Sequence, residues 1–235
     1  MVTIQNLHKK FGKNQVLAGV DLDIKEGGIF AVLGPNGSGK TTLIKSILGM
    51  VIPDRGTITI DNKNIRKSPK YRNNIDYLPQ IANFPGNLKV KELIKMIKDL
   101  RGFTDQDEEL IKQFQLEPFL NKKLGNLSGG TKQKVNLVLT FMFDSPLVIL
   151  DEPTTGLDPI SLLRLKALIQ SAKAKGKTIL ITSHIMSFVE EIADEIVFLL
   201  EGKIYFKGSI NTLKTNTGQS DFEHAIASIL SENHA

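Results

Sequence analysis

A glycine-rich segment at residues 34–42, GPNGSGKTT, carries the residue types that bind phosphate. Glycines let backbone N–H groups converge on an anion because no Cβ blocks its approach. The ammonium of Lys40 can reach the β- and γ-phosphates of a nucleotide, and the hydroxyl of Thr41 can coordinate Mg²⁺. A glycine-rich turn that binds no ligand has a similar composition, so the surrounding sequence must distinguish the two interpretations. The residues of this candidate phosphate site are Gly34, Pro35, Asn36, Gly37, Ser38, Gly39, Lys40, Thr41 and Thr42.

Two adjacent acids, Asp151 and Glu152, follow the apolar run LVIL. Buried carboxylates are costly unless a positive charge compensates for them. We expect Asp151 to hold Mg²⁺ through a water molecule, and Glu152 to polarise an attacking water as general base. An ordinary exit from a strand is the alternative, and the glycine-rich segment argues against it.

Three single residues fit the same chemistry. Gln80 follows the short strand NIDYLP, where its amide can reach Mg²⁺ or the attacking water. His184 ends the strand ILITSH and can donate a hydrogen bond to a γ-phosphate. Phe11, in KKFGKN, can stack on a nucleotide base. A histidine at a strand end is usually structural and a single phenylalanine usually belongs to a core, so these assignments depend on the two motifs above.

A second candidate anion site lies in LGNLSGGTKQK, where Ser128, Gly129 and Gly130 precede an apolar helix. Ser128 is a suitable N-cap, and the glycines expose N–H groups at the positive end of the helix dipole. One chain does not need two phosphate sites. The second is explained if it serves a neighbouring copy of the protein.

These residues require elements that bring them to one edge of a sheet. Apolar runs at residues 27–34, 146–153 and 177–184 read as buried strands, and helical patterns follow at residues 40–48, 161–176 and 187–195. This alternation predicts an α/β fold with a mixed, mainly parallel sheet, whose ligands lie at the carboxyl ends of the strands. Residues 2–11 and 15–24 alternate as antiparallel strands do. Further along the chain, a hairpin is expected at Glu201 and Gly202. The tail from Asn211 is polar up to a helix at residues 221–230.

We predict one domain with three parts. Residues 1–81 and 144–210 form the core with its N-terminal antiparallel β-subdomain, residues 82–143 form a helical insertion, and residues 211–235 form a short helical tail. The chain has 235 residues and no cysteine, which excludes a disulfide framework and thiolate metal sites. No signal peptide and no span of about 20 apolar residues is present.

The charge is modest, with 30 basic and 25 acidic residues and a net charge of +5, and does not indicate a nucleic-acid partner. Basic residues nevertheless cluster in the segment DNKNIRKSPKYRNN. Such runs are usually solvated faces, and a surface facing anionic lipid head groups is the alternative. The basic residues of this cluster are Lys63, Arg66, Lys67, Lys70 and Arg72.

Taken together, the motifs resemble the nucleotide-binding subunit of ABC transporters from Val2 to about Gly208. GPNGSGKT resembles the Walker A loop of the P-loop NTPases, LVILDE resembles Walker B, and LSGGTKQK resembles the ABC signature. GLD at residues 156–158 resembles the D-loop, and Gln80 and His184 resemble the Q- and H-loops. Thr131 stands where the signature usually has glutamine, which puts one side-chain contact in doubt. Phe11 stands where the stacking residue is often tyrosine.

The resemblance implies an ATPase that binds ATP and Mg²⁺ and works as a head-to-tail dimer with a second cassette. It also implies separate integral membrane permease subunits and a cytoplasmic location at the inner face of the cell membrane. The short tail looks more like exporter cassettes than sugar importers, and YLPQIANFPGNLKVKELI resembles the copper-processing branch associated with nitrous oxide reductase maturation. Alternatives are an ABC ATPase acting on DNA or ribosomes, and a P-loop kinase or GTPase, which would not explain the signature.

Overall fold

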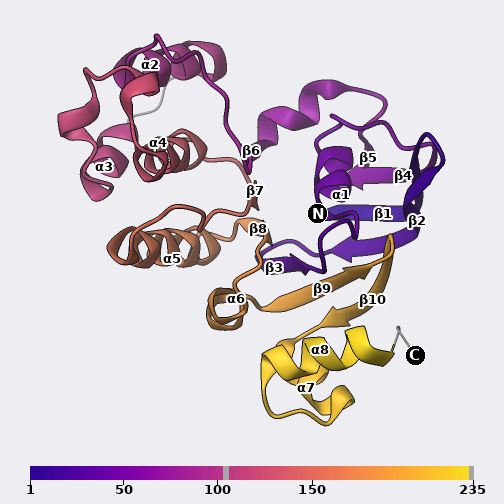
Figure 1. Ribbon diagram of the computed structural model, residues 1–235. Coiled ribbons are helices and arrows are strands. Elements are labelled where there is room, and N and C mark those ends of the chain that lie inside the picture. Colours follow the sequence, from indigo (N-terminus) through magenta and orange to yellow (C-terminus); the bar gives the residue numbers. More distant parts are fainter. Residues whose placement is uncertain (103–105, 233–235) are drawn as a thin grey trace. The chain divides into compact units, whose positions relative to one another are not determined.

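The computed structural model describes residues 1–102 and 106–232, which fall into two compact units (Figure 1). Unit 1 comprises Met1–Arg72 and Thr178–Ala235, and unit 2 comprises Asn73–Lys177. The predicted helical insertion and tail each include three residues outside the described ranges, 103–105 and 233–235. Unit 2 includes strands and a helix that we assigned to the core, and our domain boundaries stay a prediction.

Unit 1 contains an antiparallel sheet of strand order β2-β1-β4-β5. Strand β1 lies between β2 and β4 and is antiparallel to both, as the alternation of apolar and polar residues predicted. The inward-facing side chains, among them Ile4, Leu7 and Leu17, are almost completely buried. The strands are β1 (Val2–Phe11), β2 (Asn14–Ile24), β4 (Arg55–Ile60) and β5 (Lys63–Asn64).

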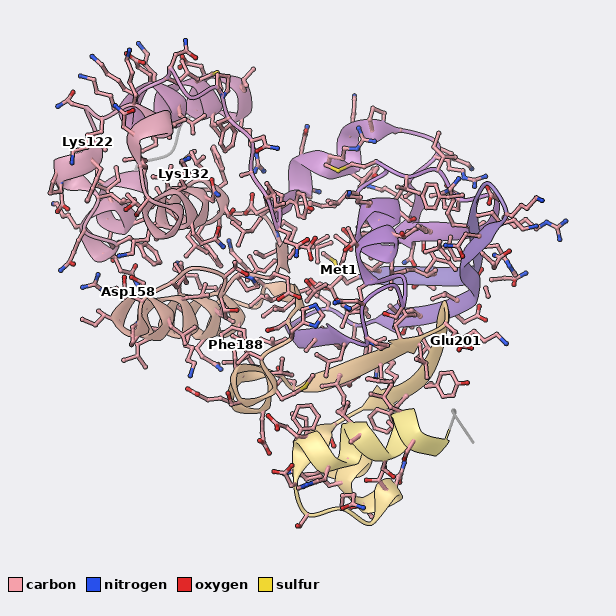
Figure 2. All side chains as sticks on the ribbon, in the orientation of Figure 1. Met1, Lys122, Lys132, Asp158, Phe188 and Glu201 are labelled. Atoms are coloured by element: carbon pink, nitrogen blue, oxygen red, sulfur yellow. The ribbon has the colours of Figure 1, made fainter. Side chains whose placement is uncertain are left out.

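Unit 1 also contains the strands that lead into the glycine-rich loop. Strand β3 (Gly28–Leu33) pairs in parallel with both β8 (Thr178–Thr182) and β9 (Glu195–Leu200). Strand β10 (Lys203–Gly208) returns antiparallel to β9. The predicted hairpin is confirmed, because Glu201 (Figure 2) and Gly202 both have positive φ, as a tight type I′ turn requires. Helices α1 (Lys40–Ile47) and α6 (Met186–Ile192) follow β3 and β8.

The C-terminal segment corrects one prediction. We expected a polar tail from Asn211 to the last helix, but helix α7 (Ile210–Thr217) occupies that segment and packs against α8 (Phe222–Glu232) (Figure 1). The hydroxyl of Ser209 accepts a hydrogen bond from the Thr212 N–H at 3.1 Å, which caps the start of α7. Gly218, with a φ of 65°, ends it. The two buried side chains, Ile210 and Leu213, were too few to reveal a helix in the polar sequence.

In its described residues, unit 2 combines two parallel strands with four α-helices. Strands β6 and β7 pair in register from Ile75 and Leu147 to Leu78 and Leu150. The helices bury Leu93, Leu110 and Val138 in the core of this unit, and short 3₁₀ turns connect them. The elements are β6 (Ile75–Leu78), α2 (Val90–Arg101), α3 (Gln106–Gln113), α4 (Gly129–Phe141), β7 (Leu147–Asp151) and α5 (Pro159–Ala174).

Candidate functional site

The glycine-rich loop joins the buried end of β3 to the first turn of α1. Gly34 has a φ of 145°, and a Cβ built there would lie 2.0 Å from the Leu199 carbonyl oxygen on β9. No other residue fits at this point, since the backbones of the loop and β9 are nearly in contact. Gly39 also has positive φ, 106°, and places Lys40 at the start of α1. The loop therefore presents its backbone N–H groups beside the positive end of a helix dipole.

Lys40 is folded into this loop and is only 8% exposed. Its Nζ donates to the carbonyl oxygens of Gly34 at 2.7 Å and Pro35 at 3.0 Å. The hydroxyl of Ser38 is buried without a hydrogen-bond partner among the described residues. A cation held inside the loop and an unsatisfied buried hydroxyl are both donors suited to the oxygen atoms of a phosphate chain. Thr41 is exposed and Thr42 is half-buried at the same helix start.

The loop and His184 leave neighbouring strands at the same level, because Val32 on β3 pairs with Thr182 on β8. His184 is exposed two residues beyond β8. The N–H of Ile185 donates to the Ser183 hydroxyl at 3.1 Å, which closes a turn around the histidine. The structure thus places His184 at the predicted edge of the sheet in unit 1.

Phe11 lies at the end of β1 and is 51% exposed, so it is not a core residue. The Lys9 ammonium lies 5.3 Å from the centre of its ring. The exposed ring face and the adjacent cation suit a planar, negatively charged ligand such as a nucleotide.

In unit 2, the acid pair stands at the end of β7. Asp151 is 3% exposed and Glu152 is 7% exposed. Burial, together with the smaller effect of the Asp151 charge, raises the pKa of Tyr77 on the neighbouring strand to about 12. Glu152 has a φ of 52°, unusual for a residue other than glycine, and its carbonyl oxygen accepts from the Thr155 N–H at 3.3 Å. The turn directly after β7 is therefore a tight and specific one.

Gln80 leaves β6 at the same edge. Leu78 on β6 pairs with Leu150 on β7, so the segment that carries Gln80 and the acid pair start from matching positions. The Gln80 side chain is exposed. The structure thus brings three of the predicted site residues of unit 2 to one sheet edge.

The second predicted anion site is a capped helix start. The Ser128 hydroxyl accepts from the Thr131 N–H at 3.2 Å and contacts the Thr131 hydroxyl at 2.8 Å. The predicted N-cap is confirmed, and the threonine in the signature-like segment is held by this contact. Gly129 is exposed, and a Cβ on it would meet no atom within 4 Å. A Cβ on Gly130 would lie 2.5 Å from the Gly156 carbonyl oxygen, so this position requires glycine.

The arrangement agrees with the comparison to known proteins. Residues 17–155 match the ABC transporter family, which is more than half of the chain. The chain belongs to the ABC transporter family. The cassette is also 35% identical over 237 residues to the lantibiotic transport ATP-binding protein SrtF of Streptococcus pyogenes, covering 95% of this chain and 99% of that one. It is 33% identical to a Nod factor export ATP-binding protein I of Burkholderia orbicola, covering 90% and 72%.

Solved cassettes share the fold. An ATP-binding subunit of an ABC transporter superposes with a TM-score of 0.91 at 29% identity, covering 98% of this chain and 99% of that one. A dimeric post-hydrolysis state of the cassette MJ0796, bound to ADP and Pi, gives a TM-score of 0.80 at 26% identity, covering 89% and 98%. The predicted α/β P-loop fold is thereby confirmed, and the cassette is an ATP-binding ATPase subunit. The resemblance to the copper-processing branch stays a prediction.

Two polar groups of the cassette that sequence reasoning missed hold the segment after β7 against α4. The side-chain amide of Gln133 donates to the Pro153 carbonyl oxygen at 3.1 Å. Lys134 lies 2.7 Å from the carboxylate of Asp158, which caps α5 by accepting from the Ser161 N–H at 2.8 Å. Figure 2 labels Asp158 at the start of that helix. The sequence signal available for Gln133 and Lys134 was their place in the segment LSGGTKQK, one helical turn into α4.

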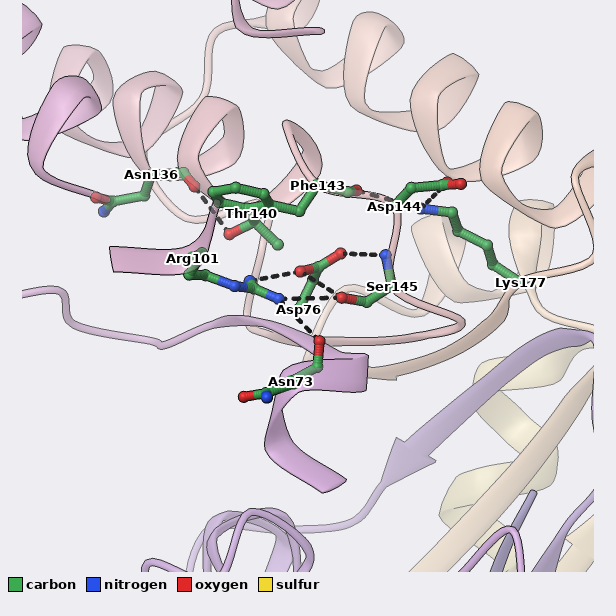
Figure 3. Close-up of polar contacts among 9 residues, drawn as sticks. All are labelled: Asn73, Asp76, Arg101, Asn136, Thr140, Phe143, Asp144, Ser145 and Lys177. Atoms are coloured by element: carbon green, nitrogen blue, oxygen red, sulfur yellow. Dashed lines mark hydrogen bonds and ion pairs between the residues drawn. The ribbon is translucent and has the colours of Figure 1, made fainter. Parts of the chain in front are cut away.

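A buried charged cluster fixes β6 upstream of Gln80 (Figure 3). Asp76 is fully buried and accepts from Arg101 at 2.6 Å, and from the Ser145 hydroxyl at 2.9 Å and N–H at 3.2 Å. The Arg101 guanidinium lies 4.4 Å from the centre of the Phe143 ring. The Asp76 carboxylate on β6 thus connects the last residue of α2 to the segment that leads into β7. An aspartate inside the apolar strand NIDYL was the only sequence signal.

None of the helices in residues 1–102 and 106–232 has the length and hydrophobicity needed to cross a bilayer.

Proposed function

We propose that the cassette drives transport as one half of a head-to-tail dimer, with each ATP held between the glycine-rich loop of one copy and residues 128–130 of the other. The observation that carries this proposal is the pair of anion sites in one chain. The Lys40 loop is complete in unit 1, and unit 2 carries a second, exposed helix start at Ser128. A nucleotide shared by two copies would contact the Lys40 loop of one copy and the Ser128 helix start of the other.

In unit 1, the loop N–H groups and the Lys40 ammonium bind the β- and γ-phosphates. The hydroxyl of Ser38, buried and unpartnered among the described residues, gains a hydrogen-bond acceptor when phosphate is bound. Phe11 stacks on the base through its exposed ring face. His184, at the edge shared by β3 and β8, donates to the γ-phosphate.

Mg²⁺ fits the donor set, because Thr41, Gln80 and Asp151 offer the hydroxyl, amide and carboxylate oxygens that this ion prefers. We propose that these three residues hold it, Asp151 through a water molecule. Bound Mg²⁺ neutralises charge on the phosphate oxygens. Glu152 orients and deprotonates the attacking water, and the tight turn after β7 holds its backbone.

The proposed partners are a second cassette and separate integral membrane permease subunits, and no nucleic acid. The dimeric cassette structure supports the first, and the relatives described as transport and export ATP-binding proteins support the second. The cassette accordingly lies in the cytoplasm at the inner face of the cell membrane and serves an exporter. No observation favours a role on DNA or ribosomes, and co-purification with a membrane protein separates the two functions.

The proposal is tested by Glu152→Gln. We expect ATP affinity to persist and the turnover rate to fall about 10²–10⁴-fold, because the variant keeps the shape of the side chain but loses the general base. ATP-bound dimers should accumulate on size-exclusion chromatography. Glu108→Gln, which changes an exposed glutamate on α3, is the control and should behave as the parent. Turnover of Glu152→Gln near the parental rate contradicts the proposal.

A further inference from the structure

A cavity in unit 1 is lined by residues other than those assigned to ATP. It has a volume of about 390 Å³ and an apolar wall that includes Val51, Ile58 and Ile65. Arg66 and Arg72 also line it. Arg66 donates to the Pro53 carbonyl oxygen at 2.7 Å, which leaves most of its N–H groups available.

Arg72 is held at this cavity by the end of α1. It donates to the carbonyl oxygens of Leu48 at 2.9 Å and Gly49 at 3.1 Å, and it also keeps further N–H groups. Beside it, Tyr71 lines the cavity with a hydroxyl that is buried and has no hydrogen-bond partner among the described residues. An unsatisfied hydroxyl costs free energy unless a ligand satisfies it. Two arginines and a hydroxyl are the groups that bind a phosphate oxygen.

The surface around the cavity is strongly basic. Residues 62–74 contain no acid, and the side chains of Lys63, Lys67 and Lys70 are exposed. Within residues 1–102 and 106–232, none of these three lysines takes part in an ion pair. Their charges are therefore available to an external anion.

The same surface exposes apolar side chains. Ile52, which lines the cavity, is 74% exposed, and Met50 is 62% exposed two residues earlier. Exposed aliphatic side chains beside unpaired lysines are typical of proteins that bind the interface of an anionic bilayer. A solvated face would carry the lysines without the apolar groups and without an unsatisfied hydroxyl.

We propose that this basic surface, formed by Met50, Ile52 and residues 62–72, binds anionic phospholipid, with the lipid phosphate at Arg66, Tyr71 and Arg72. The inference rests on the proposed location at the membrane, but it concerns a different site from the ATP site. Its test uses no nucleotide, so it fails or succeeds separately from the ATPase assignment.

The experiment is co-flotation of the full chain with phosphatidylcholine vesicles, with and without phosphatidylglycerol. We expect binding only when phosphatidylglycerol is present, and weaker binding at high salt. The triple variant Lys63→Gln, Lys67→Gln, Lys70→Gln should bind on the order of a hundredfold more weakly. The control removes the same charge from exposed lysines of unit 2 and should bind nearly as the parent; it consists of Lys91→Gln, Lys95→Gln and Lys123→Gln.

Two single variants separate lipid binding from charge alone. Ile52→Ser should weaken vesicle binding, and Tyr71→Phe should weaken it without lowering the thermal stability of the free chain. Equal binding to both vesicle types, or equal loss in the two triple variants, overturns the proposal. The proposal is also overturned if the chain binds no vesicles, and if only the Lys63, Lys67 and Lys70 variant assembles less well with the membrane subunits in detergent. That result would identify an acidic protein surface as the ligand.

Discussion

Lys40 contacts two carbonyl oxygens of its own loop, at 2.7 Å and 3.0 Å, and is largely removed from water. A cation held in this way needs little reorganisation when a phosphate chain replaces the neutral acceptors. Its position depends on Gly34, since any Cβ there would collide with the backbone of β9. Backbone geometry thus holds Lys40 in position for the phosphate contact that we propose.

Lys40→Ala should lower the affinity for Mg-ATP by at least about tenfold, because a charge-assisted hydrogen bond contributes about 1.5–3 kcal/mol. Isothermal titration calorimetry measures the change. Lys45→Ala removes an exposed lysine from the last turn of the same helix and is the control. Parental nucleotide affinity in Lys40→Ala would show that the phosphate assignment is wrong.

Asp158 provides a pH-dependent prediction. The hydrogen bond from Lys134, together with those from Ser161, holds the pKa of its carboxyl well below the ordinary value. A lowered pKa in the folded state stabilises the fold above the unfolded pKa of about 3.9, and this contribution is lost as the pH falls through the folded pKa. Lys134→Gln should raise the pKa of Asp158 toward the ordinary value, measured by NMR titration of the carboxyl carbon.

The energetic effect of that change should be small. Because the Asp158 side chain is 48% exposed, solvent screens the ion pair, and we expect Lys134→Gln to cost less than about 1 kcal/mol at neutral pH. Lys132→Gln is the control on the same helix, at an exposed position labelled in Figure 2. An Asp158 pKa that does not move in Lys134→Gln means that the capping bonds from Ser161 alone set it.

At the scale of elements, the apolar strands and the helices with a clear apolar face were predictable. Strand β3 and helix α1 followed from a continuous apolar run and an amphipathic pattern, since each obeys one local rule. Helix α7 was missed because its polar composition hides two buried residues, Ile210 and Leu213. The Asp76 cluster was also missed, because its partners Arg101 and Ser145 are distant in sequence and only the fold brings them together.

That cluster makes a prediction about unit 2. Arg101→Met should destabilise it by about 3–5 kcal/mol, because the variant leaves the carboxylate of Asp76 buried without its cation. Urea denaturation measures the change, with exposed Lys95→Met on the same helix as control. Adding Asp76→Asn to Arg101→Met should recover part of the loss. A cost for Arg101→Met within about 0.5 kcal/mol of the control would contradict a stabilising role.

At the scale of the whole molecule, each candidate anion site was located from its motif, but no sequence pattern indicates which copy of the chain a site serves. The Lys40 loop belongs to unit 1 and the Ser128 helix start to unit 2. Local rules fix each site separately, since a glycine loop and an N-cap depend on neighbouring residues only. Assembly is a property of two chains, and it must be tested by mixing them.

Mixing two defective chains tests the shared site. Lys40→Ala and Ser128→Arg should each be inactive alone, because each change damages both sites of its own homodimer. In the mixed dimer one site carries both defects and the other carries neither, so ATP hydrolysis should return in part. For the parent, specific activity should rise with protein concentration, because dilution separates the two half-sites.

Lys122→Arg, at an exposed lysine of unit 2, is the control for the added arginine and should leave turnover unchanged. A mixture of Lys40→Ala with this control should recover hydrolysis only to the extent that the control chains supply it. Undiminished turnover in Ser128→Arg, or specific activity that stays constant down to concentrations at which only monomer remains, would exclude sharing. In that case the glycines after Leu127 act only as a helix cap, and the second phosphate contact must come from elsewhere in the same chain.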